Sequence, residues 1–465
     1  MSDIKFGTDG WRAIIAQDYT VDNVKRVAEA TALFMQEQGM GKAVIGYDCR
    51  FGGQLFAETT ARVLGSYNIH VVMGDRIATT PMISLAVTKL KADIGIVITA
   101  SHNPPSYNGF KLKSSYGGPS IPADIASVEN HIPAQAKKDI RSLDEMKSAN
   151  LLSYEDLETM YYDHVMASFD VEAIRKSDFH IGYDAMYGAG YRIFPRILPD
   201  AKLLHCDYNP SFYGQAPEPI ERNLKPFSEM IKADPKMAIG IANDGDADRI
   251  GMYDGEGNFV DSHHILLLLL YYLHKHKGLS GKVVITFSVT DKMVRLAEKF
   301  GLEVEVTKIG FKYIAEIMTK EDVLVGGEES GGLAVKGHIP ERDGVWIGLM
   351  ILEFMAKTGK TLQELVQLVY DEVGTFAFDR YDLHITQELK EKVIANCKAN
   401  HYTEFGPLKI VNTQTLDGFK YYLDNGTWIM IRPSGTEPVL RVYCEAPDRS
   451  KAISTLDSVK AVLLS

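Results

Sequence analysis

Short apolar runs recur along the chain and alternate with longer stretches of helical periodicity. The runs are rich in β-branched residues, each ends in a Gly, Asp or Ser turn, and they cover residues 42–48, 94–98, 179–184, 237–242 and 282–287. Buried strands that alternate with helices are typical of α/β layers. We therefore expect an α/β fold.

The pattern breaks at several places, and 465 residues exceed what one ordinary core holds. A polar, helix-prone stretch (134–150) separates two α/β segments, and a helical run (344–357) belongs to a third. After Gly374 the chain turns to amphipathic strands and helices, with a strand–loop–strand unit at 427–445. The predicted domains are 1–147, 148–254, 255–373 and 374–465.

Charge and composition exclude some function classes. The net charge is −11, and no basic footprint of a nucleic-acid-binding protein is visible. An anionic substrate would have to be attracted by local Arg and Lys side chains, backbone N–H groups and metal. We expect no nucleic-acid partner.

Cysteine usage and hydropathy indicate a cytoplasmic protein. The four cysteines lie far apart without metal or redox spacing, at positions 49, 206, 397 and 444. The start, M-S-D-I-K-F-G-T-D-G, lacks the apolar stretch of a signal peptide. The longest apolar run, 265–273, is about half of the roughly 20 residues that span a bilayer, so we expect a buried helix there and no membrane partner.

The first candidate loop, T-A-S-H-N-P-P at 99–105, directly follows the apolar run 94–98. Sites in α/β sheets are built at such strand ends. Ser101, with His102 beside it and Lys111 nearby in N-G-F-K, fits a covalent nucleophile. The alternative is a plain turn, because Ser, Asn and Pro are the usual turn residues.

The second loop carries Asp244, Asp246 and Asp248 at alternate positions after an apolar run. Their charges would repel one another unless a cation lies between them, and ligands that are all oxygen favour Mg²⁺ or Ca²⁺. An EF-hand is excluded because Arg249 and Gly255 occupy its sixth and twelfth positions. The alternative is a solvated acidic turn.

Two further loops carry polar groups between glycines. In G-G-E-E-S-G-G (326–332), Glu and Ser side chains suit sugar hydroxyls, although a flexible acidic turn fits as well. In R-P-S-G-T-E-P (432–438), with Arg441 beyond, hydroxyls, a glycine and guanidiniums suit a phosphate cradle rather than a simple hairpin turn. The opening G-T-D-G-W-R (7–12) adds another Gly-rich turn with an Arg.

Together, in this order and at this spacing, the loops resemble the α-D-phosphohexomutase superfamily. The resemblance runs from G-T-D-G-W-R to R-P-S-G-T-E-P, nearly the whole chain. It implies four domains around a central cleft, with three related α/β domains built on mixed sheets and a C-terminal α+β domain. Each domain would supply one loop.

The resemblance also implies roles for matching positions. The implied catalytic residues are the phosphoserine Ser101 with Lys111, Arg12, His102 and Arg249. The implied ligands of Mg²⁺ are Ser101, through its phosphate, and Asp244, Asp246 and Asp248. The implied substrate-binding residues are Thr8, Lys308, Gly310, Glu328, Ser330, Arg432, Ser434, Gly435, Thr436 and Arg441. Lys111 could act as a base only if its surroundings lower its pKa.

The implied reaction interconverts hexose 1-phosphate and hexose 6-phosphate through phosphoserine and a 1,6-bisphosphate. Glu329 and Gly332 stand where glucosamine-type members usually carry Gln and His, so we expect glucose phosphates, with mannose phosphates still open. Glucose 1,6-bisphosphate would be intermediate and activator, hexose phosphates the partners, and the protein a monomer or homodimer.

Two rival interpretations are a metal-dependent phosphatase and a non-catalytic sugar-phosphate sensor. A dedicated loop for a second phosphate argues against the phosphatase. An intact serine nucleophile argues against the sensor.

Overall fold

The computed structural model describes residues 4–7, 9–433 and 439–464. The chain forms two compact units. Unit 1 comprises Met1–Val284 and Gly310–Val366, and unit 2 comprises Ile285–Ile309 and Gln367–Ser465.

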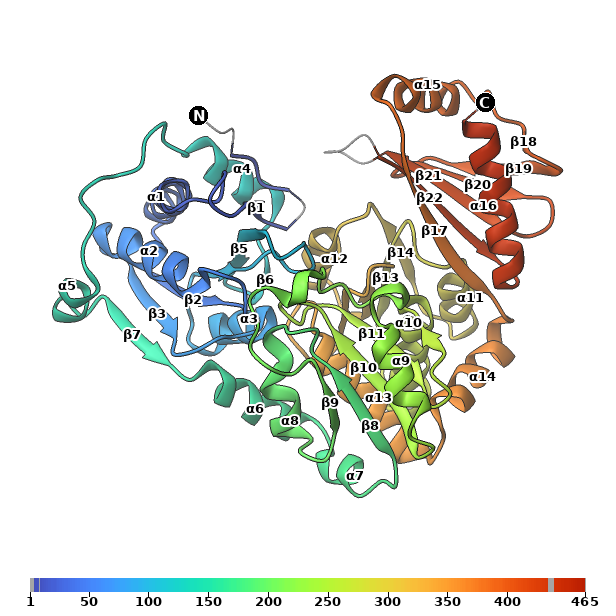
Figure 1. The fold of residues 1–465 in the computed structure, drawn as a ribbon, viewed down its shortest axis with the longest axis horizontal. Helices are drawn as coiled ribbons and strands as arrows, with labels where there is room; N and C mark the ends of the chain where they lie inside the picture. The colour runs from blue at the N-terminus through green and yellow to red at the C-terminus, as the bar shows by residue number, and fades with distance from the viewer. Residues whose placement is uncertain (1–3, 8, 434–438, 465) are drawn as a thin grey trace. The chain divides into compact units, whose positions relative to one another are not determined.

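Unit 1 begins with a mixed sheet in the order β1-β5-β4-β2-β3-β7, to which β6 adds beside β5. Its strands are β1 (Trp11–Ile14), β2 (Lys42–Tyr47), β3 (His70–Gly74), β4 (Ile94–Ile98), β5 (Tyr107–Ser114), β6 (Gly118–Pro119) and β7 (Leu152–Glu155). Its helices are α1 (Val21–Glu37), α2 (Gly53–Ser66), α3 (Thr80–Lys89), α4 (Pro122–Asn130) and α5 (Leu143–Ser148). The helices α1 and α2 lie side by side (Figure 1). Strands β2, β3 and β4 are parallel, whereas β5 returns antiparallel to β4, so the loop between β4 and β5 lies at the carboxyl end of a buried strand.

A second mixed sheet of unit 1 has the order β12-β11-β10-β8-β9. Its strands are β8 (His180–Asp184), β9 (Lys202–Leu204), β10 (Met237–Asn243), β11 (Ile250–Asp254) and β12 (Phe259–Val260). The accompanying helices are α6 (Leu157–Ser168), α7 (Val171–Arg175), α8 (Ile193–Ile197) and α9 (Lys225–Lys232), with 3₁₀ turns η1 (Ala189–Tyr191), η2 (Phe212–Gly214) and η3 (Glu221–Asn223). The acidic loop joins β10 to its antiparallel neighbour β11.

The last part of unit 1 places an acidic turn between β15 (Val323–Gly327) and the antiparallel β16 (Leu333–Val335). Around this pair the chain forms α10 (Ser262–Tyr271), the π-helical turn η4 (Tyr272–His276), β13 (Lys282–Thr286), α12 (Phe311–Met318), α13 (Gly344–Thr358) and α14 (Leu362–Val373). Strand β13 and helix α14 each run over a boundary between the units.

Unit 2 contains an antiparallel sheet in the order β17-β22-β21-β20-β19-β18. Its strands are β17 (Ala377–His384), β18 (Glu404–Phe405), β19 (Leu408–Gln414), β20 (Phe419–Leu423), β21 (Trp428–Pro433) and β22 (Val439–Ala446). Its helices are α15 (Gln387–Lys398) and α16 (Arg449–Leu463), which pack on this sheet (Figure 1). The segment Ile285–Ile309 adds α11 (Asp291–Lys299) and β14 (Val304–Thr307).

Most sequence-based elements are confirmed. The run 94–98 is β4, and the helix predicted at 344–357 is α13. The apolar run 265–273 is buried, except for the partly exposed Tyr271, in α10 and the turn after it. The helix-prone interpretation of 134–150 is wrong for most of that stretch, because α5 covers only Leu143–Ser148. The segment before α5 instead attaches to α2, where the Arg62 Nε donates to the carbonyl oxygen of Arg141 at 3.0 Å.

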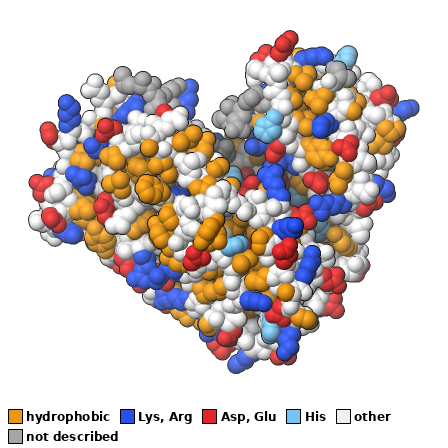
Figure 2. Space-filling model, in the orientation of Figure 1, with side chains coloured by type: hydrophobic (Ala, Val, Ile, Leu, Met, Phe, Trp, Pro, Cys, Tyr) orange, Lys and Arg blue, Asp and Glu red, His pale blue; other side chains and the backbone are white. Residues whose placement is uncertain are grey.

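The surface and the hydropathy of the helices can be described directly. Side chains of both charge signs are interspersed over the face in Figure 2. Across the described ranges, none of the helices combines the length and the apolar character that crossing a bilayer requires.

Candidate active site

Ser101 lies directly beyond β4 in a strained turn, with φ at +52°. Its backbone N–H donates to Thr99 Oγ1 at 2.9 Å. Its buried hydroxyl donates to Asp244 Oδ2 at 2.6 Å, although the two residues are 143 positions apart. The structure therefore brings the first and second predicted loops together at the atoms that the sequence singled out.

Arg50, which the sequence analysis did not identify, holds this loop by its backbone. Its guanidinium is buried and donates four hydrogen bonds of 2.6–2.9 Å to carbonyl oxygens, those of Ser101, Asn103, Pro104 and Tyr107. Because these carbonyls span the turn, one side chain fixes the path of the backbone that carries the nucleophile.

Asp48 orients Arg50 from the end of β2. Its Oδ2 lies 3.4 Å from Arg50 Nε and accepts a 2.5 Å hydrogen bond from Thr99 Oγ1. Burial raises the pKa of Asp48 to about 6 despite the neighbouring guanidinium. A sequence signal existed, since Asp48 and Arg50 follow a buried strand as Ser101 does, but nothing local indicated their partners.

The carboxylates of Asp244, Asp246 and Asp248 are buried, and each offers an oxygen such that all three atoms lie within 4.8 Å of one another. In the described part of the chain, Asp246 Oδ1 and Asp248 Oδ1 have no hydrogen-bond partner. Orphaned buried carboxylate oxygens are costly without a cation. The donor set consists of oxygen alone, which fits Mg²⁺.

The pKa values within this triad diverge. Burial and the charges of Asp246 and Asp248 raise the pKa of Asp244 well above its usual value. Burial acts in the same direction on Asp246, but Lys111 and a 2.5 Å hydrogen bond from Thr80 lower the pKa of that carboxyl. The repulsion among the three carboxylates therefore acts mainly on the ionisation of Asp244.

Lys111 lies fully buried among acidic groups. Its Nζ is 2.8 Å from Asp246 Oδ2, 2.9 Å from Asp248 Oδ2 and 2.9 Å from Asp9 Oδ2. Burial alone would lower the pKa of Lys111, but these carboxylates raise it above its ordinary value. The lowered pKa that a base role requires is therefore not found, and the arrangement suits a permanent cation.

The other three predicted catalytic residues are Arg12, Arg249 and His102. Arg12 donates from Nη1 to Asn103 Oδ1 at 2.8 Å, and the backbone N–H of Arg249 donates to Asp244 Oδ1 at 3.0 Å. His102 Nδ1 lies 3.3 Å from Ser101 Oγ. Burial, with Arg249 and Arg12 nearby, holds the pKa of His102 well below its usual range, so the imidazole is neutral at pH 7.

The third predicted loop meets the second. The N–H of Ile250 donates to the carbonyl oxygen of Gly331 at 3.2 Å, and Arg249 pairs with Gly332 in an antiparallel bridge. Glu328 is buried, and burial raises its pKa to about 7, whereas Ser330 is half-buried.

Arg342, also missed by the sequence analysis, joins these groups. Its Nη2 donates to Asp9 and, at 2.7 Å, to Asp248, and its Nη1 lies 3.7 Å from Glu328. Arg342 therefore connects the acidic loop, the Gly-rich start of the chain and the third loop within unit 1.

Unit 2 carries three further predicted residues that the structure describes, Lys308, Arg432 and Arg441. Arg432 on β21 stands directly opposite Arg441 on β22. Asp417 lies 3.4 Å from Arg432 and accepts a hydrogen bond from the N–H of Ile309, next to the exposed Lys308. Arg441 Nε lies 3.8 Å from Asp382 Oδ1, so each guanidinium has one acidic neighbour. Two guanidiniums on facing positions of neighbouring strands suit a phosphate, which each can bind through several N–H groups.

Gly310 begins α12 in unit 1 with φ at +136°, a conformation that favours glycine. Thr8, Ser434, Gly435 and Thr436, also predicted to bind substrate, lie outside the described residues.

Comparison with known proteins identifies the family of the chain. Sequence models of phosphoglucomutase/phosphomannomutase match four segments: alpha/beta/alpha domain I at residues 3–139, domain II at 159–257, domain III at 261–373 and the C-terminal domain at 389–461.

Whole-chain relatives carry related names. A Thermococcus kodakarensis phosphoglucomutase/phosphomannomutase is 31% identical over 97% of this chain and 96% of its own. A Methanococcus vannielii phosphoglucosamine mutase is 32% identical over 97% of each chain. A solved Thermus thermophilus protein, named for phosphomannomutase activity, is 32% identical, covers all of both chains and has a TM-score of 0.88.

These matches confirm the predicted fold class, with α/β domains followed by a distinct C-terminal domain. The chain therefore belongs to the phosphoglucomutase/phosphomannomutase family of phosphohexomutases, which are intramolecular phosphotransferases.

Proposed function

We propose that this protein interconverts α-D-glucose 1-phosphate and glucose 6-phosphate through a phosphorylated Ser101. The single observation that carries the proposal is the 2.6 Å hydrogen bond from Ser101 Oγ to Asp244 within the acidic triad. It places a buried hydroxyl among carboxylates that can hold a divalent cation, with guanidiniums and an ammonium around them.

In the forward direction, the phosphoryl group moves from Ser101 Oγ to the free 6-hydroxyl of glucose 1-phosphate. The bond from Ser101 Oγ to phosphorus breaks, the bond from phosphorus to the sugar oxygen forms, and the proton of the sugar hydroxyl passes to Ser101 Oγ. The resulting 1,6-bisphosphate turns around and returns its 1-phosphoryl group to Ser101, which leaves glucose 6-phosphate. Such transfer depends on positioning and charge neutralisation more than on covalent help from the protein.

The surrounding side chains supply that neutralisation. Arg12 donates to Asn103 of the nucleophile loop, and, besides burial, the charges of Arg249 and Arg12 both lower the pKa of His102 in that loop. Lys111 keeps its positive charge because of its acidic neighbours. We assign these three side chains to the transferring phosphoryl group. Neutral His102, near Ser101 Oγ, is the group best placed to exchange a proton there.

Asp244, Asp246, Asp248 and an oxygen of phosphorylated Ser101 would hold Mg²⁺, which supplies charge neutralisation at the phosphoryl oxygens. The unpartnered Oδ1 atoms of Asp246 and Asp248 support this assignment within the described residues.

The other loops would bind the rest of the substrate. Glu328 and Ser330 are assigned to sugar hydroxyls, and the facing pair Arg432 and Arg441 to the phosphate that is not being transferred. Lys308 and Gly310 are assigned to the substrate as well. Glucose 1,6-bisphosphate would activate the enzyme by phosphorylating Ser101.

Glucosamine phosphate is the second candidate substrate. Relatives such as the Methanococcus vannielii protein are named phosphoglucosamine mutases. The adjacent Glu328 and Glu329 offer carboxylates that suit an ammonium group on the sugar. Against it stand Glu329 and Gly332 at the positions where glucosamine-type members usually carry Gln and His.

The test is a coupled assay of glucose 1-phosphate, glucosamine 1-phosphate and mannose 1-phosphate in parallel. Each reaction contains Mg²⁺ and a trace of the matching 1,6-bisphosphate, and Ser101→Ala is the control. Fastest turnover of the glucose ester, lost in the variant and on chelation, supports the proposal. Fastest turnover of glucosamine 1-phosphate contradicts the glucose assignment and supports the second candidate.

A further inference from the structure

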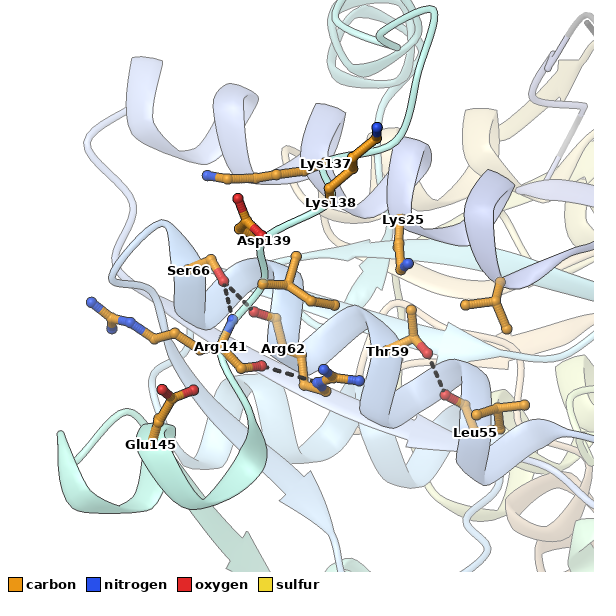
Figure 3. Close-up of a pocket in the computed structure, with 12 residues that line it drawn as sticks. Lys25, Leu55, Thr59, Arg62, Ser66, Lys137, Lys138, Asp139, Arg141 and Glu145 are labelled. Carbon is orange, nitrogen blue, oxygen red and sulfur yellow. Dashed lines mark hydrogen bonds between the residues drawn. The ribbon is translucent and has the colours of Figure 1, made fainter.

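A pocket of about 580 Å³ lies between α1, α2 and the loop before α5, and it shares no residue with the site around Ser101 (Figure 3). One wall is a single face of α2, since Leu55, Thr59, Arg62 and Ser66 follow helical spacing. The opposite side comes from Val21 and Lys25 of α1 and from residues 137–141. The volume lies in the range of small-molecule sites, about 300–1,000 Å³.

The lining of this pocket is positively charged although the whole chain carries −11. It contains five cationic side chains against two acidic ones: Lys25, Arg62, Lys137, Lys138 and Arg141 against Asp139 and Glu145. A concave surface lined by one sign of charge concentrates ions of the opposite sign. The pocket is therefore suited to an anion.

Several of these cations remain available to a ligand. In the part of the chain that is described, Nη1 and Nη2 of Arg62 and Nζ of Lys138 form no hydrogen bond or ion pair, and the charge of Arg62 also acts on the exposed Glu145. Lys25 has only the largely exposed Asp22 at 3.3 Å, and such surface pairs are weak. Lys25 and Arg62 lie on facing sides of the pocket (Figure 3).

Hydrogen bonds fix the wall that carries these groups. The backbone N–H of Arg141 donates to Ser66 Oγ at 2.8 Å, and the Arg141 guanidinium donates to Gly65 and Asn68 on the far side. Arg62 Nε donates to the Arg141 carbonyl oxygen at 3.0 Å, which leaves the two terminal nitrogens of Arg62 in the fork geometry that suits phosphate. A wall held in this way loses little freedom on binding.

The pocket also has apolar surface that the fold does not bury. Leu55 is 53% exposed, and Val21 and Ile140 are half-buried. A bare inorganic anion would leave this surface uncovered, whereas an organic phosphate with a flat apolar part would cover it.

From these observations we propose that the pocket binds a nucleoside di- or triphosphate. The linked phosphates lie between Lys25 and Arg62, within reach of the exposed Lys138 side chain, and the base lies against Leu55 and Val21. This proposal is independent of which sugar phosphate the enzyme isomerises, because it concerns binding at a separate set of residues.

Titration calorimetry of the full-length protein with ADP, and separately with pyrophosphate, tests the proposal. We expect ADP to bind at one site, and Arg62→Ala to weaken it about tenfold or more, as loss of a charge-assisted hydrogen bond implies. Lys138→Ala, which removes no contact within the described protein, should weaken binding severalfold. Two controls should bind ADP as the unaltered protein does: Lys176→Ala, at an exposed position outside the pocket, and Arg249→Ala, beside Ser101.

Three results would overturn the proposal. One is absence of ADP binding at millimolar concentration. Another is equal ADP affinity in Lys138→Ala and Lys176→Ala. This comparison does not involve Arg62, so it remains valid even if Arg62→Ala loosens the loop at Arg141. The last is pyrophosphate binding as tightly as ADP, which would contradict the contact with apolar surface.

Discussion

At the scale of single residues, Arg50 is the side chain on which the geometry of the nucleophile depends most. Ser101 adopts a positive φ, which costs a non-glycine residue about 1 kcal/mol or more and persists only when the surroundings impose it. The four hydrogen bonds from Arg50 to the loop carbonyls supply that constraint. Arg50 is therefore a positioning residue.

We expect Arg50→Ala to lower kcat about 100-fold while KM changes little, because a displaced nucleophile affects the transfer more than binding. Removing one partner of the buried pair with Asp48 should also lower the free energy of unfolding by about 3 kcal/mol. Steady-state kinetics and urea unfolding measure both effects.

Arg50→Lys should fail to restore kcat, since an ammonium cannot reproduce the four bonds of the guanidinium fork. Arg76→Ala, at a 37% exposed arginine, is the matched control. A normal kcat in Arg50→Lys would mean that the charge alone matters and that the positioning role is wrong.

Glu328 gives a pH prediction of defined sign. Burial raises its pKa from 4.5 to about 7 in the folded protein. The folded state binds a proton at Glu328 more tightly than the unfolded state does, and this contributes fully to the free energy of unfolding below about pH 4.5. The contribution is lost as pH rises to about 7, a change of about 3 kcal/mol. Relative to Glu328→Gln, the unaltered protein should therefore lose unfolding free energy across this interval.

Urea unfolding of both proteins at intervals from about pH 4.5 to about pH 7.5 measures the difference. A difference that stays constant with pH would show that Glu328 is ionised throughout and would contradict the effect of burial.

At the scale of elements, the sequence predicted where the site loops lie because each loop follows a buried strand. Strand β4 leads to Ser101, β10 to the acidic triad and β15 to Glu328. An apolar run that ends in a polar turn is a local signal, and it was sufficient to predict the positions of these three loops.

Contacts between elements could not be predicted in the same way. Arg342 contacts Asp9 across 333 residues and Asp248 across 94, and no local pattern around Arg342 indicates these partners. The prediction of a helix-prone stretch at 134–150 was wrong for the same reason. Its helix-forming residues are held along α2 by hydrogen bonds at Arg141, so tertiary contacts override local propensity.

The acidic loop gives a contrast between two neighbouring carboxylates. Sequence alone suggests that removing any one charge, for example with Asp246→Ala, relieves repulsion. In the structure Asp246 is bonded to Lys111 and Thr80, whereas Asp244 bears the raised pKa. Asp244→Asn should therefore leave the free energy of unfolding unchanged or higher. Asp246→Asn should lower it by about 1–3 kcal/mol, because buried partners lose an acceptor.

Both variants should lose nearly all turnover, since each removes a carboxylate from the proposed Mg²⁺ site. Thermal unfolding without divalent cations separates the effects on the fold from those on the metal. Equal destabilisation by the two substitutions would contradict the division of charge within the triad.

At the scale of the whole molecule, an acidic protein must attract an anionic substrate by local groups. Arg432 and Arg441 stand directly opposite each other in unit 2. We expect Arg432→Ala to raise KM about tenfold through loss of a charge-assisted contact to phosphate. The thermal stability of the apoprotein should fall little, because the pair that Arg432 forms with Asp417 is partly exposed to solvent and such pairs are weak.

The control is Arg449→Ala, at an arginine of the same unit whose side chain is 63% exposed. An unchanged KM in Arg432→Ala, or the same change in both variants, would count against a phosphate site between β21 and β22.

The central claim is that Ser101 carries the transferring phosphoryl group. The most direct measurement is incubation of the protein with Mg²⁺ and glucose 1,6-bisphosphate labelled in its phosphates, followed by mass spectrometry of the peptide that contains Ser101. The account predicts label on Ser101, lost in Ser101→Ala and on chelation, and released to glucose 6-phosphate when unlabelled monophosphate is added. Label on another residue, or label released only as inorganic phosphate, would contradict it.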